Sequence, residues 1–479
     1  MTRPMTPAMD PSQVRWAIAG ILAVFFTAGL SMNIVLTALP VIVSDLDGNQ
    51  IHYSWVVIIN LLANAASTPI WGKLADMVSK KRLFQCAAVI FIVACLLAGF
   101  APNMEVLLAG RLLQGTAMGG VTTLTMAIIA TVVPPRERGK YAGWLGLCMT
   151  TSTLGGPLLG GFIVDVSSWR WCFLIGVPLT VISGVLLTKV LQVVEEKRPV
   201  KVDYLGSVLL VASSSALLIW LSFAGVEEYF AWVSWQSGAI LFGAVLLLAL
   251  FALVERASSE PVVALRMITN RTTFLALVSS VCIAVSLGAL PPYLMQYFQL
   301  GRGLGPTEAG LMLVPMIFGN LVATTVTGRW VTRSGRWKRY LVVGAVVLTA
   351  GLLGLAAAAG SAPVWLTGVV LFVVGLGFGA QMQNLMIAVQ NTVPVTRVGQ
   401  ASSLIAFFRT YGGAAWNSVL ATVMAVQVGT LAVATPTVGH GDPTYANAGA
   451  VAFLVAACIS LPAIISNALM REEPLRTTI

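Results

Sequence analysis

The sequence contains few charged residues. Only 10% of its 479 residues are Asp, Glu, Lys or Arg, whereas 57% are hydrophobic. A soluble globular domain carries about 25% charged residues. Many of the apolar runs exceed the roughly 18 residues that a helix needs to cross a bilayer. Because backbone groups in lipid must be bonded internally, we expect these runs to be membrane-spanning helices. Their length and continuity exclude barrel strands, which are short and alternate in polarity.

Residues that carry catalytic or metal chemistry are also scarce. The two histidines, His52 and His440, fall in predicted loops, and the six cysteines lack metal-ligand spacing. The sequence has no Gly-x-x-x-x-Gly-Lys-Ser/Thr motif, so ATP is not the expected energy source. No His/Asp/Glu cluster lies in the apolar runs, which argues against an intramembrane enzyme. We therefore expect no metal, no cofactor and no enzyme activity. No cleavable signal is evident at the first run.

Basic residues exceed acidic ones, giving a formal net charge of +10. No basic run is interleaved with aromatic residues, so nucleic acid is not an expected partner. The excess instead follows the positive-inside rule, with Lys and Arg in alternate loops and Asp and Glu in most of the others. This alternation predicts cytoplasmic termini and fourteen spans, near residues 16–42, 54–77, 82–101, 105–133, 138–164, 171–193, 204–224, 234–254, 272–299, 306–331, 340–360, 363–391, 399–426 and 446–469.

Two pairs of landmarks indicate an internal repeat. A basic turn at Gly72-Lys73-Leu74-Ala75-Asp76 has a degraded copy at Gly328-Arg329-Trp330-Val331, 256 residues later. A Val-Pro-x-x-x-x-Gly segment that ends at Gly139 recurs with nearly the same offset, ending at Gly399. Six spans with short loops need roughly 200 residues, so about two helices are inserted between the halves.

The repeat predicts an all-α membrane protein made of two six-helix bundles and two inserted helices. The expected parts are residues 1–195, 196–260 and 261–479. Parallel repeats of this kind place a substrate site between the bundles near the bilayer midplane.

The motifs resemble those of the major facilitator superfamily. The resemblance rests on the turn from Gly72 to Arg82, on Arg111-x-x-Gln114-Gly115, and on Gly155-Gly156-Pro157-Leu158-Leu159-Gly160-Gly161. Three further features narrow the resemblance to the fourteen-helix drug:proton antiporters. They are the two inserted helices, Trp169-Arg170-Trp171, and Phe407-Phe408-Arg409 before Gly412-Gly413. The resemblance covers nearly the whole chain.

The resemblance implies roles in gating and coupling for ten residues: Gly72, Asp76, Arg82, Arg111, Gln114, Gly115, Gly156, Pro157, Gly161 and Asp165. Asp76 would act as a conformational latch, although the basic turn also fits topology alone. Arg111 would serve proton coupling or central hydrogen bonding, or it snorkels to the headgroups. The Gly156–Gly161 segment would form the interface that seals an exporter, a role whose physics matches plain helix packing.

Polar and adaptable side chains within the spans predict an amphipathic substrate cavity. They are Asn33, Asn60, Asn64, Met149, Tyr293, Asn320, Gln383, Asn384, Arg409 and Trp416. Hydrogen bonding between helices is the competing interpretation for each of them.

Three positions depart from the family pattern. Ser31 stands where many drug:proton antiporters carry an acid, ahead of Ala38-Leu39-Pro40. Ser79 replaces the usual glycine of the first turn, and Thr332 stands where the second turn might carry an acid. Without a midplane carboxylate, neutral, zwitterionic, anionic or lipid-like substrates become more plausible than cations. A proton carrier must then be sought elsewhere, and Asp165 and Asp76 are the best candidates.

The sequence predicts a secondary exporter of small amphipathic compounds that works by alternating access. We expect it to be proton-coupled, monomeric, and a multi-pass protein of a bacterial plasma membrane, with the lipid bilayer as its surroundings. A dedicated exporter of an endogenous metabolite or lipid is the alternative. A transport-inactive sensor would normally add a soluble domain.

Overall fold

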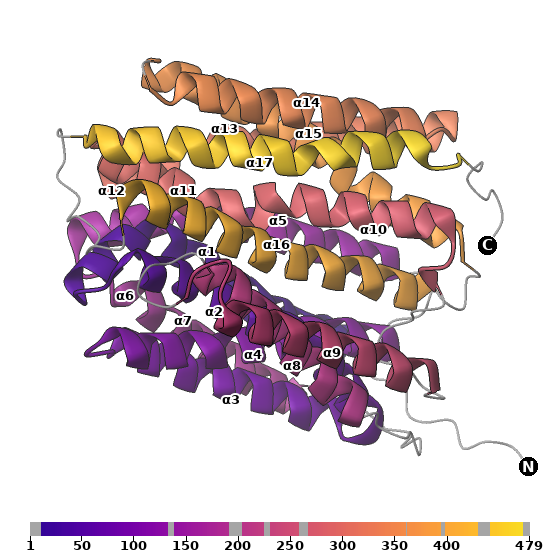
Figure 1. Cartoon of the computed structure of the whole chain (residues 1–479). Helices are drawn as coiled ribbons and strands as arrows, with labels where there is room; N and C mark the ends of the chain where they lie inside the picture. The colour runs from indigo at the N-terminus through magenta and orange to yellow at the C-terminus, as the bar shows by residue number, and fades with distance from the viewer. Residues whose placement is uncertain are drawn as a thin grey trace, which may run out of the picture. The chain divides into compact units, whose positions relative to one another are not determined.

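The structure is a computed structural model of the chain, and it is almost entirely helical (Figure 1). It describes residues 11–132, 138–190, 204–224, 230–257, 267–360, 362–393, 398–429 and 441–472. Within these ranges an isolated bridge also joins Ala224 and Phe230.

Each predicted span overlaps a helix of the structure. Ten helices in the described ranges are long and apolar enough to cross a membrane. Shorter apolar helices cover Trp171–Val185, Val208–Leu221 and Arg271–Ala284. The all-helical membrane architecture is thus confirmed, and the count of fourteen spans stays a prediction.

The chain divides into two compact units. Unit 1 contains residues 1–38 and 63–202, and unit 2 contains residues 39–62 and 203–479. The end of the first helix and the start of the second therefore belong to unit 2, as do the helices of the predicted insertion. The three-part division expected from the repeat stays a prediction.

Unit 1 is built around a pair of neighbouring helices, α3 and α4. Its elements are the first part of α1 (Pro11–Asp45), the last part of α2 (Gln50–Met77), α3 (Lys80–Gly99), α4 (Met104–Val132), α5 (Arg138–Val166), α6 (Trp171–Leu174) and α7 (Gly176–Val190). Phe84 and Phe91 of α3 are fully buried in a core that α1, α2 and α4 share. Gly110 of α4 lets α3 approach, because a Cβ there would lie 2.9 Å from the Ala98 backbone nitrogen.

Unit 2 contains the remaining helices. They are α8 (Tyr204–Phe223), α9 (Trp235–Ala257), α10 (Arg271–Ala284), η2 (Val285–Ala289), α11 (Leu290–Gln296), η3 (Tyr297–Gly301), α12 (Pro306–Leu311), α13 (Val314–Ser334), α14 (Lys338–Ala358), α15 (Val364–Asn391), α16 (Val398–Val428) and α17 (Pro443–Leu469). Polar contacts join α8 to α9 within their hairpin and join α8 to α16. Trp220 donates to Ser237 Oγ across the hairpin (2.9 Å), and Thr422 of α16 donates to the Leu221 carbonyl (3.1 Å).

The predicted span at 272–299 is not a uniform α-helix. It runs through α10, η2, α11 and η3, so two π-helical turns interrupt it. Pro291 and Pro292 explain the first turn, because each proline lacks an N–H and its ring would clash with the carbonyl four residues earlier. The carbonyl of Gly288, four residues before Pro292, instead accepts from Asn417 Nδ2 (3.3 Å). Such π turns are frequent at functional positions.

Candidate functional site

A buried arginine network lies in unit 1. Arg111 of α4 is 1% exposed, and its Nη1 donates to Gln114 Oε1 one turn along the helix (2.5 Å). Gln114 Nε2 donates in turn to Ser31 Oγ of α1 (2.9 Å) and approaches Cys95 Sγ (3.8 Å). The structure thus brings Arg111 and Gln114, two of the predicted coupling residues, together with Ser31. Ser31 is the position at which many drug:proton antiporters carry an acid.

The chemistry of this network follows from Ser31. A hydroxyl accepts a hydrogen bond without adding charge, so Gln114 and Ser31 place neutral groups in line with the guanidinium of Arg111. An ionisable group at such a depth is costly and marks a functional position by default. The arrangement suits hydrogen bonding to a polar or anionic group, and Ser31 offers no carboxylate to a cation.

The predicted glycine interface packs α5 directly on α1. A Cβ on Gly156 would overlap the Asn33 Cβ, and one on Gly160 would overlap the Ile34 carbonyl. Thr37 Oγ1 donates to the Pro157 carbonyl (3.1 Å). Small residues that allow two backbones to touch are typical of membrane helix interfaces. The close approach that the motif predicted is present.

The first basic turn has a helix-capping geometry. Ser79 lies between α2 and α3, has φ −49°, and accepts from the Arg82 backbone N–H (3.4 Å). Glycine is not required at that φ, so the departure at Ser79 does not strain the turn. Arg82 is exposed, and Lys81 Nζ donates to the Thr188 carbonyl (2.9 Å). Asp76 lies in the last turn of α2, and its side chain lies outside the described residues, so the latch stays a prediction.

A second buried network joins the start of α2 to α11 and α16 within unit 2. Gln50 and Gln296 exchange amide hydrogen bonds (3.2 and 2.6 Å). Tyr53 OH donates to the Pro292 carbonyl (2.5 Å), and Ser54 Oγ lies 3.1 Å from Tyr293 OH.

The network continues onto α16, where Tyr293 OH donates to the Asn417 carbonyl (3.0 Å). These polar side chains are almost completely buried: Gln50, Tyr53, Ser54, Tyr293, Gln296 and Asn417. Sequence reasoning selected Tyr293 but missed Gln50, Tyr53, Ser54 and Gln296. Their spacing contained a signal, because 50/53/54 and 293/296 are one helical turn apart.

The other predicted cavity residues are dispersed. Asn33, Asn320 and Asn384 each hydrogen-bond within their own helix, to the Gly29 carbonyl (2.8 Å), to Thr324 Oγ1 (3.2 Å) and to the Ala380 carbonyl (2.7 Å). Trp416 donates to the Val281 carbonyl (2.7 Å).

Exposure differs widely among the remaining predicted residues. Met149 is 50% exposed, Asn60 is buried, Asn64 and Arg409 are half-buried, and Gln383 is exposed. Their role in a common cavity stays a prediction.

The acids differ in burial. Asp165 is exposed near the end of α5. Among the acids whose side chains the structure describes, Glu255 is the buried one, at 3% exposure near the end of α9. Sequence reasoning placed this residue just outside a span and did not consider it. Glu255 is therefore a third candidate for proton binding, besides Asp76 and Asp165.

Comparison with known proteins places the chain in a transporter family. The model of the Major Facilitator Superfamily matches residues 21–417. An uncharacterized MFS-type transporter of Mycobacterium tuberculosis is 31% identical, covering 98% of this chain and 71% of the relative. Multidrug transporter protein MdtP of Bacillus subtilis is 30% identical, covering 86% of this chain and 76% of the relative.

A solved structure shares the fold. It is a bacterial homolog to the human lysosomal transporter Spinster, in an inward-facing and unoccupied conformation, with a TM-score of 0.71 and 11% sequence identity. The match covers 98% of this chain and all of that one. With the family model covering most of the sequence, these findings show that the chain belongs to the Major Facilitator Superfamily, a family of multi-pass membrane transporters rather than enzymes.

Proposed function

We propose that the protein is a secondary active exporter of small amphipathic compounds, of the fourteen-helix drug:proton antiporter type. The proposed topology has fourteen spans in a bacterial plasma membrane, with both termini in the cytoplasm. The name of the Bacillus subtilis relative supports drug export. Transport by alternating access would require no nucleotide.

The contact between α5 and α1 is the observation that carries export. Gly156 and Gly160 leave no room for a side chain against Asn33 and Ile34, and Thr37 bonds the Pro157 carbonyl. This direct backbone contact supports the sealing role that the resemblance assigns to the motif.

The second network supports a two-state cycle. The bonds of Gln50, Tyr53 and Ser54 to α11 join a segment of the first half of the sequence to the second half. Under the proposed topology this segment lies at the outer surface. Opening on that side would break these bonds, whose loss would be offset by substrate or proton binding.

Growth and accumulation assays in a strain that lacks its own exporters test the proposal. Expression should raise tolerance to several amphipathic compounds and lower their accumulation, whereas Arg111→Ala should abolish both effects. If no compound's tolerance or accumulation changes, multidrug export is wrong.

Reconstitution in vesicles with an imposed pH gradient tests the energy source. We expect uptake into the vesicles to follow the gradient and to fall in at least one of Asp76→Asn, Asp165→Asn and Glu255→Gln. Uptake that is independent of pH, or unchanged in all three variants, would contradict proton coupling at these acids.

A dedicated exporter of an endogenous metabolite or lipid is the second candidate, and Ser31 favours it. The position beside Gln114 carries a hydroxyl rather than a carboxylate, so the network offers no counter-charge to a cationic drug. Profiling should include anionic and zwitterionic compounds. Tolerance confined to one such class would favour the dedicated exporter.

A further inference from the structure

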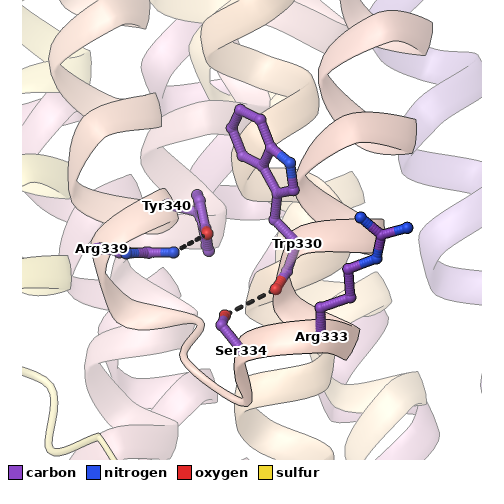
Figure 2. A pocket seen from close by; sticks show the side chains of 5 residues that line it. All are labelled: Trp330, Arg333, Ser334, Arg339 and Tyr340. Atoms are coloured by element: carbon purple, nitrogen blue, oxygen red, sulfur yellow. Dashed lines mark hydrogen bonds between the residues drawn. The ribbon is translucent and has the colours of Figure 1, made fainter.

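A pocket of about 490 Å³ lies in unit 2 where α13 ends and α14 begins (Figure 2). It is lined by Trp330, Arg333, Ser334, Arg339 and Tyr340. The turn between the helices is short because Gly335 adopts φ +66°, a left-handed conformation that favours glycine, and its N–H caps the Val331 carbonyl (2.8 Å). This turn brings an arginine from each helix to one pocket.

The aromatic side chains orient one of the two arginines. The guanidinium of Arg339 lies over the Tyr340 ring, 4.6 Å from its centroid, and Nη2 donates to the Tyr340 hydroxyl (Figure 2). The Tyr340 ring packs in turn on Trp330, with centroids 5.8 Å apart. An arginine held in this way keeps donors of its planar fork available and loses less entropy on binding an anion.

The surroundings of the pocket are strongly positive. Residues 329–340 contain five basic residues and no acid. A nearby acid, Glu472, accepts from the Lys338 backbone N–H (3.1 Å), and so caps α14. Trp330 is 51% exposed beside these charges. An exposed tryptophan at the end of an apolar helix is typical of the headgroup level of a bilayer.

We propose that this pocket binds the phosphate of an anionic phospholipid headgroup. Arginine forks match phosphate oxygens in geometry and charge. Under the proposed topology, on which this inference rests, the pocket faces the cytoplasmic leaflet, where basic clusters recognise anionic lipids. Positive charge alone would hold the turn in the cytoplasm, but it would not require a pocket or an arginine fixed on tyrosine. The exposed Trp330 favours a lipid over a soluble phosphate.

Native mass spectrometry of the full chain in detergent tests the site. The probes are phosphatidylglycerol, phosphatidylcholine and soluble glycerol 3-phosphate. Arg333→Gln with Arg339→Gln should weaken retention of phosphatidylglycerol roughly 10- to 30-fold, since each basic residue near such a headgroup contributes on the order of 1 kcal/mol. Arg329→Gln with Arg336→Gln removes the same charge from exposed positions outside the lining. That control should lose much less of the lipid, because neither side chain lines the pocket.

A conservative pair separates recognition from topology. Arg333→Lys with Arg339→Lys keeps the charge of the turn but loses the fork, so we expect a smaller, measurable loss of phosphatidylglycerol, and none for Arg329→Lys with Arg336→Lys. This comparison tests whether the lining arginines bind the headgroup even if the glutamine variants do not fold. Equal losses in the lining and control pairs, or equal retention of phosphatidylcholine, would overturn the site. Binding of glycerol 3-phosphate without lipid retention would overturn the lipid assignment. None of these readouts depends on export.

Discussion

Both halves of the chain use glycine to bring corresponding helices together, but they differ in how tightly. In unit 1, a Cβ on Gly156 of α5 would overlap Asn33 of α1. In unit 2, a Cβ on Gly412 of α16 would lie 3.0 Å from Val281 of α10, and one on Gly413 would lie 3.3 Å from Gly288 of η2. By the predicted repeat these are the fifth and first spans of each half. The packing device is shared, and the first half has the less tolerant version.

The partner helices differ more than the glycines do. In unit 1, α1 stays α-helical and its Thr37 donates to the Pro157 carbonyl of α5. In unit 2, the corresponding first span contains the two π turns η2 and η3. The hydrogen-bond donor lies here on the glycine-bearing helix, because Asn417 of α16 donates to the Gly288 carbonyl of η2. A donor on either helix can thus stabilise the same kind of contact. The π turns lie beside α11, the segment that also binds Gln50 and Tyr53.

The two basic turns have also diverged. The first is capped by Ser79 and keeps Asp76 in its sequence. The second uses Gly335 in the left-handed region and gathers Arg333 and Arg339 around an aromatic pair. The two turns that the predicted repeat relates therefore differ, with an acid in one and a candidate anion site in the other.

The largest expected effect comes from filling the glycine contact between α5 and α1. Gly156→Ala should force α5 and α1 apart, and overpacking of this kind costs about 1–3 kcal/mol. We expect a lower melting temperature in detergent and reduced efflux. Gly155→Ala is the matched control, because its Cβ would meet Leu30 at an ordinary 3.7 Å. Gly412→Ala and Gly413→Ala should have smaller effects, in that order. Equal effects at 155 and 156 would break the comparison.

The second prediction concerns the amide pair of unit 2. Gln50→Leu leaves the Gln296 amide buried without its partner, a loss of about 1–3 kcal/mol. Replacing both glutamines by leucine removes the orphaned group, so the double variant should be more stable than the sum of the single ones predicts. Melting temperatures of the single and double variants give the coupling. Gln383→Leu, at an exposed glutamine of α15, is the control and should change little. Additive effects would show that the pair does not hold α2 to α11.

Sequence reasoning recovered the helices and several contacts, and its failures have a physical pattern. Hydrophobic run length favours a helix, so each predicted span overlaps a helix of the structure, and ten helices in the described ranges are long and apolar enough to cross a membrane. Arg111 and Gln114, which the resemblance named as one motif, are hydrogen-bonded because one-turn spacing on a helix brings them together. Contacts between helices depend on rotation about the helix axis, which spacing alone leaves open. Gln383 and Asn384 illustrate this, since neighbours on α15 have opposite environments, one exposed and one fully buried.

The buried network of Gln50, Tyr53 and Gln296 shows the same limit. These residues are polar at helical spacing, but nothing in the sequence says that α2 and α11 meet. Tyr293 was chosen as cavity wall, whereas its hydroxyl is bonded to Ser54 and Asn417. The π turns were also missed, although Pro291-Pro292 was a visible warning that the helix could not stay regular.

A smaller effect is expected from the hydroxyl that joins α1 to α5. Thr37→Val keeps the shape of the side chain and removes the bond to the Pro157 carbonyl, with a cost of about 1 kcal/mol. Thr422→Val removes the hydrogen bond from α16 to the Leu221 carbonyl of α8, and it should cost a similar amount. The two variants compare hydroxyl bonds of similar length in the two units by melting temperature. If Thr37→Val alone reduces efflux, the contact between α1 and α5 matters for transport as well as for stability.

The smallest expected effect lies in the first turn, and it distinguishes the two turns. Ser79→Gly removes a capping hydroxyl, and replacing a cap by glycine costs only a few tenths of a kcal/mol. Gly335→Ala places a Cβ in a left-handed conformation, which costs roughly 1–2 kcal/mol. The space around Gly335 is open, so any loss there comes from backbone strain rather than a clash. Melting temperature should therefore fall more for Gly335→Ala than for Ser79→Gly. The reverse order would mean that the first turn depends on its cap more than the second turn depends on its glycine. The two turns related by the predicted repeat would then differ in charge but not in the backbone conformation that they require.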